Sequence, residues 1–273
     1  MAGTADRRDL AGQWALVTGA SAGLGAEFCR QLADRGASLV LVARRGERLE
    51  QVAQAARGAG VETLCLAIDL AAPEGAAQVL AACSARGIDI DVLVNNAGFG
   101  LTGLYTDHGW QTEAAYLQLM VIACAQLSHG VLPGMKARGR GRILNVASVA
   151  GLVPPSAGQT LYGPAKAFLI SFSQALAAEG APYGIKVSAL CPGVTKTEFF
   201  TANGTDARIG KVSEFWKCDA VDVARAGLVA LERGKTVCVP GYQYKAMVLL
   251  ARWLPMGWVE ALSRAQNRHY RAR

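Results

Sequence analysis

The stretch QWALVTGASAGLGAEFCRQLADRG, residues 13–36, joins a short apolar run to a helical pattern through a turn rich in glycine. Residues 13–18 favour a strand buried on both faces, and Gly36 ends the helical pattern that follows the turn. Glycines let the backbone amides of such a turn approach a pyrophosphate, and the helix N-terminus attracts its negative charge. The stretch therefore predicts the first βα unit of a nucleotide-binding fold, with nucleotide contacts at Gly19, Ser21, Ala22, Gly23, Leu24 and Gly25.

The same alternation of apolar runs and alanine-rich helical stretches continues along the chain. Further strands are predicted at residues 38–43, 61–68, 91–94, 142–146, 184–190 and 236–239. Helices are predicted at residues 47–58, 73–86, 111–138 and 220–233, the third of them divided near Pro133-Gly134. With 273 residues, 52% of them hydrophobic, the chain suffices for a single α/β domain built on a parallel sheet.

Composition excludes several classes of function. The net charge of +7 comes without an organised basic face or stacking groups, so we expect no nucleic-acid partner. An anionic cofactor, an anionic membrane surface or solubility alone each explain the charge. The seven cysteines form no CxxC pair or Cys/His cluster, which predicts neither a metal site nor a disulfide framework and favours a reducing cytoplasm. Residues 1–13 contain no apolar run typical of a secretory signal.

Three loops after predicted strands carry candidate cofactor contacts. Arg44 and Arg45 follow the second strand, where an arginine accommodates a 2′-phosphate and an acidic residue bonds a ribose hydroxyl. They favour NADP over NAD, the alternative being two solvated arginines that open the next helix. After the third strand, Asp69 either caps the following turn or bonds the adenine beside Leu70. Small and amide residues after the fourth strand fit a turn close to the cofactor: Asn96, Ala97 and Gly98.

Tyr162 and Lys166 lie four residues apart, so on a helix both side chains rise from one face. A nearby ammonium stabilises the phenolate and makes the phenol a better proton donor. Pro164 places Tyr162 in or just before the first turn of this helix, where proline is tolerated. The alternative interpretation is an ordinary surface helix.

The motifs TGASAGLG, NNAG, Ser148 after a strand, YGPAK and CPGVTKTEF occur in that order, and together they resemble the classical short-chain dehydrogenase/reductase family. The resemblance covers residues 13–239 and implies a single Rossmann-type, doubly wound domain with a seven-stranded parallel sheet. It also implies a nicotinamide cofactor and hydride transfer between a carbonyl and an alcohol. By this resemblance Ser148, Tyr162 and Lys166 are catalytic, Tyr162 and Lys166 also contact the cofactor, and the nicotinamide end is bound by Pro192, Gly193, Val194 and Thr197.

One position departs from the family pattern. Where the family carries an asparagine that helps a water relay to the lysine, this chain has Met120. A methionine cannot pass a proton or hold a water well, so the departure predicts either an altered relay or reduced activity.

The last third of the chain adds features around this core, which spans about residues 13–240. Residues from about 194 to 218 have the composition of a lid, with Phe199, Phe200, Phe215 and Trp216 as an apolar enclosure or as packing. The extension at 242–273 is too interrupted to span a membrane. It suits a helix that covers the cleft or a partner subunit, or alternatively an amphipathic helix on a membrane surface.

The sequence therefore predicts an NADP(H)-dependent oxidoreductase acting on an apolar or acyl-chain carbonyl compound, such as a 3-oxoacyl compound or a steroid. The alternative is a catalytically impaired NADP-binding sensor or scaffold, which Met120 favours. Apolar residues on more than one face of the helix that carries Tyr162 predict a homodimer or homotetramer in the cytoplasm.

Overall fold

Seven parallel strands form one sheet in the computed structural model, which describes residues 8–101, 103–154, 158, 160–196 and 212–253. The strand order is β3-β2-β1-β4-β5-β6-β7. Successive strands are therefore added on one side of β1 as far as β3 and on its other side from β4 onward, and this reversal falls between β1 and β4. The predicted α/β class and parallel sheet are confirmed. The strands are β1 (Trp14–Thr18), β2 (Ser38–Ala43), β3 (Thr63–Ala67), β4 (Ile90–Asn95), β5 (Gly141–Val146), β6 (Ile185–Leu190) and β7 (Val237–Cys238).

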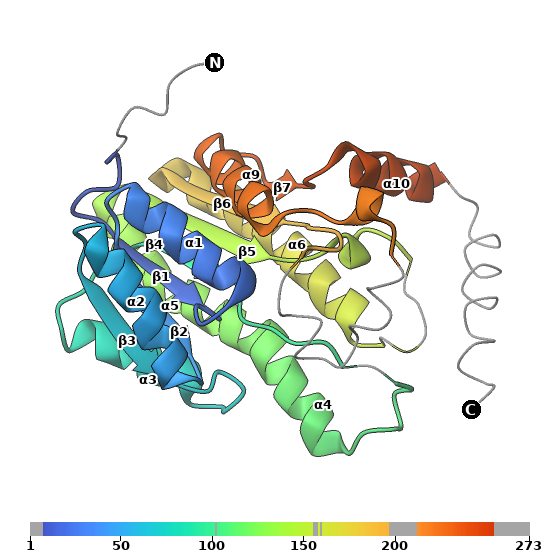
Figure 1. Ribbon diagram of the computed structural model, residues 1–273, viewed down its shortest axis with the longest axis horizontal. Helices are drawn as coiled ribbons and strands as arrows, with labels where there is room; N and C mark the ends of the chain where they lie inside the picture. Colours follow the sequence, from blue (N-terminus) through green and yellow to red (C-terminus); the bar gives the residue numbers. More distant parts are fainter. Residues whose placement is uncertain (1–7, 102, 155–157, 159, 197–211, 254–273) are drawn as a thin grey trace.

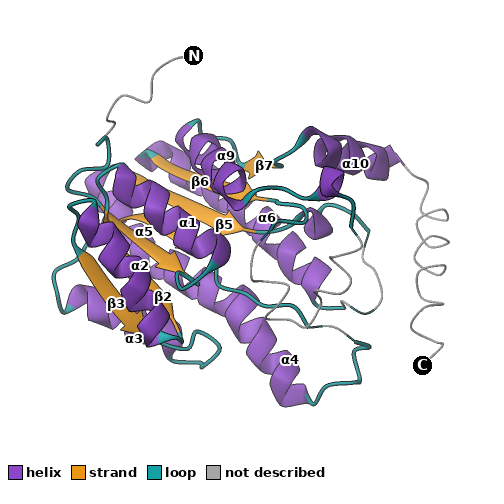
Figure 2. Cartoon of the chain, viewed as in Figure 1, coloured by secondary structure: helices purple, strands orange, loops and turns teal. Residues whose placement is uncertain are grey.

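Helices cover both faces of the sheet (Figure 1, Figure 2). One face packs against α1 (Gly23–Asp34), α2 (Gly46–Gly58) and α9 (Ala220–Glu232). The other face packs against α3 (Gly75–Ser84), α5 (Ala123–Arg138) and α6 (Tyr162–Gly180). Outside these layers lie α4 (Trp110–Leu117) and α10 (Tyr242–Trp253), and the short helical segments η1 (Gln118–Ile122), η2 (Val149–Gly151), η3 (Ala181–Tyr183) and η4 (Glu214–Trp216).

The two faces of the sheet bury separate apolar clusters. Phe28 and Leu32 of α1 belong to the first, and Leu127 of α5 belongs to the second; all three side chains are at most 1% exposed. Burial of one such side chain stabilises the fold by about 1.5–3 kcal/mol. Strands that bury both faces explain why the sequence shows continuous apolar runs rather than alternation.

The predicted break near Pro133-Gly134 is wrong: α5 continues through Pro133 to Arg138. Proline removes one backbone hydrogen bond, to the carbonyl of residue 129. His129 lies on the exposed side of α5, where water can satisfy that carbonyl. The irregular segment lies earlier, at η1, a π-helical turn between α4 and α5 that contains Met120. Such turns occur often at functional sites.

The continuous helical segment Trp110–Arg138 is long and apolar enough to cross a membrane by length and composition alone. A core helix of a soluble protein passes the same test, and Leu127, Val131 and Met135 of this segment are buried against the sheet. In the residues that the structure describes, no group of three His, Cys, Asp or Glu side chains is placed to hold a metal ion.

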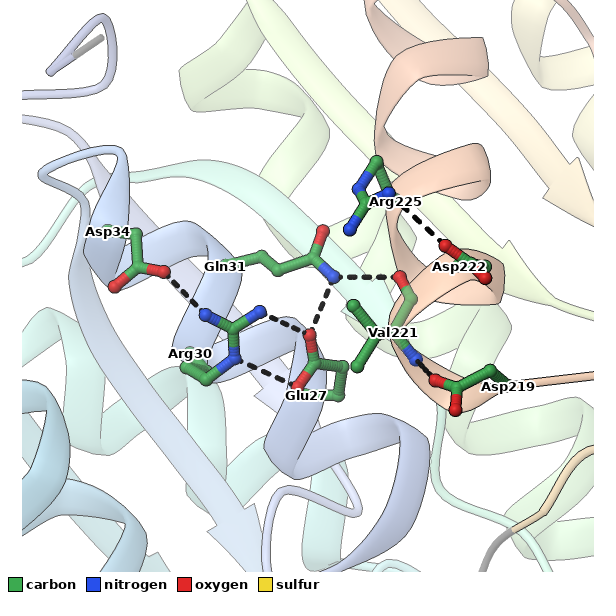
Figure 3. Close-up of polar contacts among 8 residues, drawn as sticks. All are labelled: Glu27, Arg30, Gln31, Asp34, Asp219, Val221, Asp222 and Arg225. Atoms are coloured by element: carbon green, nitrogen blue, oxygen red, sulfur yellow. Dashed lines mark hydrogen bonds and ion pairs between the residues drawn. The ribbon is translucent and has the colours of Figure 1, made fainter. Parts of the chain in front are cut away.

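Polar contacts join α1 to the start of α9 (Figure 3). The Gln31 amide donates to the Val221 carbonyl at 3.0 Å and to a Glu27 carboxylate oxygen at 2.7 Å. Asp219 caps α9 by accepting the Val221 N–H at 2.8 Å. These contacts position α9 beside α1.

A buried amide network lies at the carboxyl ends of β4 and β5. The Asn95 amide donates to Asn145 Oδ1 at 2.8 Å and to Ser128 Oγ at 3.2 Å. The Asn145 amide in turn donates to Ser173 Oγ of α6 at 2.8 Å. The network therefore connects two central strands to α5 and α6.

We predict that Asn145→Ala lowers the free energy of unfolding by about 2–4 kcal/mol, because it removes the buried hydrogen bonds of Asn145 to Asn95 and Ser173 and leaves a cavity between β5 and α6. Ser188→Ala is the matched control, since the Ser188 hydroxyl is buried without a partner among the described residues. Its removal should change stability by less than about 0.5 kcal/mol or increase it. Urea unfolding of both variants measures this, and equal losses would contradict the role of the network.

Candidate active site

The site lies at the carboxyl ends of the strands, beside the reversal between β1 and β4, where open α/β sheets bind ligands. Thr18 fastens these two strand ends together. Its hydroxyl accepts the N–H groups of Asn96 and Ala97, both at 2.9 Å, and the Asn96 amide donates to the Thr18 carbonyl at 2.9 Å. The predicted NNAG turn thus lies against the glycine-rich turn. Sequence reasoning missed Thr18, which is an ordinary strand residue by its sequence context.

The glycine-rich turn fits a bound phosphate. A Cβ on Gly25 would lie 2.1 Å from the Gly19 carbonyl oxygen, and Gly19 has a φ of +67°, so both positions require glycine. Ala22 precedes α1 without a side-chain cap, and the first turn of α1 contains no acidic residue. The first N–H groups of α1 and its positive dipole end therefore suit an anion.

Three exposed arginines follow β2, and one of them contacts this turn. Arg44 and Arg45 follow β2 as predicted, and Arg45 Nη2 donates to Ser21 Oγ at 3.3 Å. Arg48 follows in the first turn of α2, three residues after Arg45, and was not among the predicted contacts. This grouping of charge suits a 2′-phosphate on the adenosine side of a dinucleotide.

Asp69, in the loop after β3, was predicted either to cap the following turn or to bond the adenine. Asp69 Oδ1 accepts the Ala71 N–H at 2.9 Å, which is the capping role. Leu70 is buried in the core beneath the loop, with 4% of its surface exposed. An adenine contact at Asp69 or Leu70 stays a prediction.

Ser148 and Tyr162 meet above the end of β5. Tyr162 is the first residue of α6, as predicted from Pro164, and is partly buried. Ser148 caps the start of η2: its Oγ accepts the Ala150 N–H at 3.2 Å and lies 3.5 Å from the Pro192 carbonyl oxygen. A hydrogen bond from Ser148 to the phenol lowers the pKa of Tyr162, but the stronger effect of burial raises that pKa overall. The phenol is therefore held protonated, and it gives up its proton less readily than a free phenol does.

Lys166 lies one turn further along α6, below Tyr162. Its Nζ donates to the Val146 carbonyl at 2.8 Å and lies 5.8 Å from the centroid of the Tyr162 ring. Only 6% of the residue is exposed, and this burial lowers the pKa of the Lys166 amine to about 8, while the nearby Cys124 and Cys191 oppose the shift. The four-residue spacing thus brings amine and phenol together as predicted. The amine does not lower the pKa of Tyr162 below its ordinary value, because burial outweighs the other influences.

Met120 packs into the site from the π turn. It is 1% exposed and belongs to one apolar cluster with Tyr116 and Ala165, against which Tyr162 also packs. A Cβ on Gly98 would lie 2.9 Å from the Met120 sulfur. Methionine therefore fills the space between the NNAG turn and the catalytic helix.

The turn after β6 is covered by α10. The Tyr244 ring lies so close to Gly193 that a Cβ there would be 1.9 Å from the ring. The Tyr244 hydroxyl accepts the Val194 N–H at 2.8 Å and donates to the Trp216 carbonyl. The Pro192 carbonyl accepts the Val149 N–H at 3.0 Å, which joins this turn to the segment that carries Ser148.

The structure thus places the turn of Pro192, Gly193 and Val194 beside Ser148, and their contact with the nicotinamide stays a prediction. Tyr244 is a contact that the sequence pattern did not reveal. Thr197, with Phe199 and Phe200 of the predicted lid and residues 254–273 of the extension, lies outside the described residues.

Comparisons with known proteins agree with this geometry. The family model described as short chain dehydrogenase matches residues 13–208. A very-long-chain 3-oxoacyl-CoA reductase from Anas platyrhynchos is 32% identical over 271 residues, covering 96% of this chain and 82% of that protein.

Two solved structures are similar over most of the chain. A short-chain dehydrogenase from Sphingobium yanoikuyae in complex with NADPH has a TM-score of 0.79 and 32% identity, covering 93% of each chain. The bulky-bulky ketone specific alcohol dehydrogenase from Comamonas testosteroni has a TM-score of 0.74 and 29% identity, covering 94% of this chain and 93% of that one.

The buried amine of Lys166 predicts a particular pH dependence of stability. Between the folded pKa of about 8 and the ordinary lysine pKa of 10.5, the Lys166 amine binds more protons in the unfolded chain than in the folded one. Lys166 should therefore contribute a rise of about 3 kcal/mol to the free energy of unfolding as the pH increases through this window. Lys166→Met should lack this rise, whereas the exposed control Lys186→Met should keep it. Denaturant unfolding between pH 7 and pH 11 measures the difference, and parallel curves for the two variants would contradict it.

Proposed function

The chain belongs to the short-chain dehydrogenase family, and from that premise we propose that it is an NADP(H)-dependent reductase of apolar or acyl-chain ketones. The observation that carries the proposal is the convergence of Ser148, Tyr162 and Lys166 beside the glycine-rich turn. Reduction of the ketone and oxidation of the corresponding alcohol are the two directions of this reaction.

Each side chain has a role that follows from its position. The Tyr162 hydroxyl donates a proton to the carbonyl oxygen, and its raised pKa keeps that proton in place until substrate is bound. The Ser148 hydroxyl hydrogen-bonds the same oxygen as negative charge develops on it. Lys166, while protonated, stabilises the phenolate that remains on Tyr162. When bound, NADPH supplies the hydride that the carbonyl carbon accepts.

The preference for NADP(H) rests on the charge beside the glycine-rich turn. Arg44, Arg45 and Arg48 offer guanidinium groups to a 2′-phosphate, and Arg45 already reaches Ser21 in the turn. The NADPH complex of the Sphingobium relative supports the same preference. A phosphate bound there gains charge-assisted hydrogen bonds that NAD lacks.

The substrate class rests on the apolar surroundings of Tyr162. Phe99, Leu101 and Leu161 pack against the same apolar cluster, formed by Tyr116, Met120 and Ala165, against which Tyr162 packs. A long or bulky apolar group beside the carbonyl would bury surface against such a wall. The names of the two relatives, which act on a very-long-chain 3-oxoacyl-CoA and on bulky ketones, support this class.

Assembly and location are further parts of the proposal. Ile122 and Phe168 are large apolar side chains exposed near α5 and on α6, which supports a homodimer or homotetramer. The scattered cysteines, without a CxxC pair, support a location in the reducing cytoplasm. The outer face of α10 exposes Tyr242, Leu249, Leu250 and Trp253, which suits a partner subunit or, alternatively, weak contact with a membrane surface.

Turnover tests the proposal directly. Purified protein mixed with NADPH and a panel of long-chain 3-oxoacyl thioesters and bulky ketones should show sustained loss of nicotinamide absorbance. Tyr162→Phe should lower kcat by at least about a hundredfold, because no acid remains at the carbonyl oxygen. The control Tyr183→Phe changes an exposed tyrosine in η3 and should keep full activity. NADPH binding without turnover of any compound would instead favour the sensor or scaffold, which Met120 supports.

The cofactor preference has its own test. The double variant Arg44→Ala/Arg45→Ala should weaken NADPH binding by about 10- to 100-fold and leave NADH binding unchanged, because only NADPH carries the 2′-phosphate. Arg57→Ala, which removes an exposed arginine paired with Glu50 at the far end of α2, is the control. Fluorescence titration of both cofactors measures the affinities, and an equal loss for NADPH and NADH would contradict the assignment.

A further inference from the structure

A small cavity borders the Tyr162 phenol on the side of α4. Its volume is about 10 Å³, and its lining includes Tyr162, Tyr116, Glu113 and His108. A space of this size holds about one water molecule when polar groups line it. Four side chains that can carry or relay a proton therefore surround a site for a single water.

Tyr116 supplies an unsatisfied polar group at this cavity. The residue is fully buried, and its ring packs edge-to-face on Phe99 at 5.2 Å between centroids. Its hydroxyl has no hydrogen-bond partner in the described part of the chain. Burial raises the pKa of Tyr116, and the nearby Tyr162 and Glu113 raise it further. An unpaired buried hydroxyl costs about 1–3 kcal/mol, so this group calls for a bound water or ligand.

His108 and Glu113 connect the cavity to solvent. His108 Nδ1 lies 3.5 Å from Glu113 Oε1; the Glu113 side chain is 6% exposed and that of His108 is 28% exposed. Glu113 precedes Tyr116 by three residues on α4, so both rise from one face of the helix. Imidazole is the side chain that exchanges protons with water around neutral pH. The pair therefore links bulk water to a buried carboxylate beside Tyr116.

The remaining titratable groups nearby are placed differently. Asp107 is exposed and accepts the Leu104 N–H at 2.7 Å, and Tyr105 is an exposed residue on the rim of the cavity. Lys166 approaches Tyr162 through the interior, where its Nζ donates to the Val146 carbonyl. Met120 packs beside Tyr116 and cannot pass a proton.

We propose that His108 and Glu113, acting through Tyr116 and one water in this cavity, return a proton to Tyr162 after each reduction. The proposal rests on the proposed ketone reductase activity, because it concerns the proton that this reaction consumes. His108 and Glu113 are positioning and relay residues, and neither touches the reacting carbonyl.

The proton balance is complete without a further reactant. The Tyr162 O–H bond breaks as its proton goes to the carbonyl oxygen. A new O–H bond forms on Tyr162 with a proton from the water; the water takes the Tyr116 hydroxyl proton, and Tyr116 regains a proton that His108 passes on through the Glu113 carboxylate. His108 then takes a proton from solvent, so each reduced ketone consumes one solvent proton and the relay transfers no electrons.

The test combines removal of the relay with chemical rescue in the full-length enzyme. His108→Ala should lower kcat for ketone reduction by at least about tenfold at neutral pH, with the KM for NADPH unchanged. Added imidazole should restore the lost activity of this variant, which a purely structural role of His108 does not explain. Tyr116→Phe should lower kcat without rescue by imidazole, because the hydroxyl that it removes lies inside the cavity, between His108 and Tyr162 on the proposed proton path.

His129→Ala is the matched control, since His129 is an exposed histidine on α5 far along the helix from the site. The His129→Ala variant should retain full activity, and added imidazole should not change that activity. Undiminished kcat in His108→Ala, or a loss that imidazole does not restore, would overturn the relay while wild-type turnover upholds the proposed function. If the wild-type enzyme reduces no ketone, the proposed function is wrong and the relay falls with it.

A crystal structure of the wild-type protein gives a second test that is independent of activity. Density for one ordered water within hydrogen-bond distance of Tyr116 Oη and Tyr162 Oη is the expected result. An empty cavity, or a Tyr116 hydroxyl bonded to another protein group, would overturn the relay.

Discussion

The hydrogen bond between the amides of Asn95 and Asn145 is the contact on which the active-site geometry depends. It joins the ends of the two central strands, and through Ser173 it also fixes α6. Ser173 follows Lys166 by seven residues, two helical turns, so both lie on the same face of α6. Holding Ser173 against β5 therefore sets the height and rotation at which α6 presents Tyr162 and Lys166 above that strand.

The sequence was sufficient to predict the elements and the residues that act through local spacing. Apolar runs between glycine-rich turns predicted the parallel sheet, and the spacing of Tyr162 and Lys166 predicted their shared face. Contacts between distant parts of the chain leave no local pattern. Val194 and Tyr244 are 50 residues apart, and their hydrogen bond depends on where the whole fold places α10. Pro133 was misinterpreted because its local cost is small where the affected carbonyl faces water.

Burial changes the protonation of the two central groups in opposite directions. It raises the pKa of the Tyr162 phenol and lowers that of the Lys166 amine to about 8. In both cases burial favours the uncharged form of the side chain. The phenol therefore keeps its proton between turnovers, but an amine so close to losing its charge is a weak permanent counterion for the phenolate. The π turn completes this environment by placing the apolar Met120 against the same cluster. Polar groups that can exchange protons with solvent gather instead on the α4 side, around Glu113.

The close packing of Tyr244 on Gly193 links two positions that lie far apart in the sequence. Because no side chain at 193 fits beneath the aromatic ring, a relative that acquires one there must also lose the ring or move the C-terminal helix away from the turn. The two positions are therefore constrained to change together during divergence. An alignment of relatives that retain the C-terminal helix would record this constraint as covariation, with glycine accompanying tyrosine.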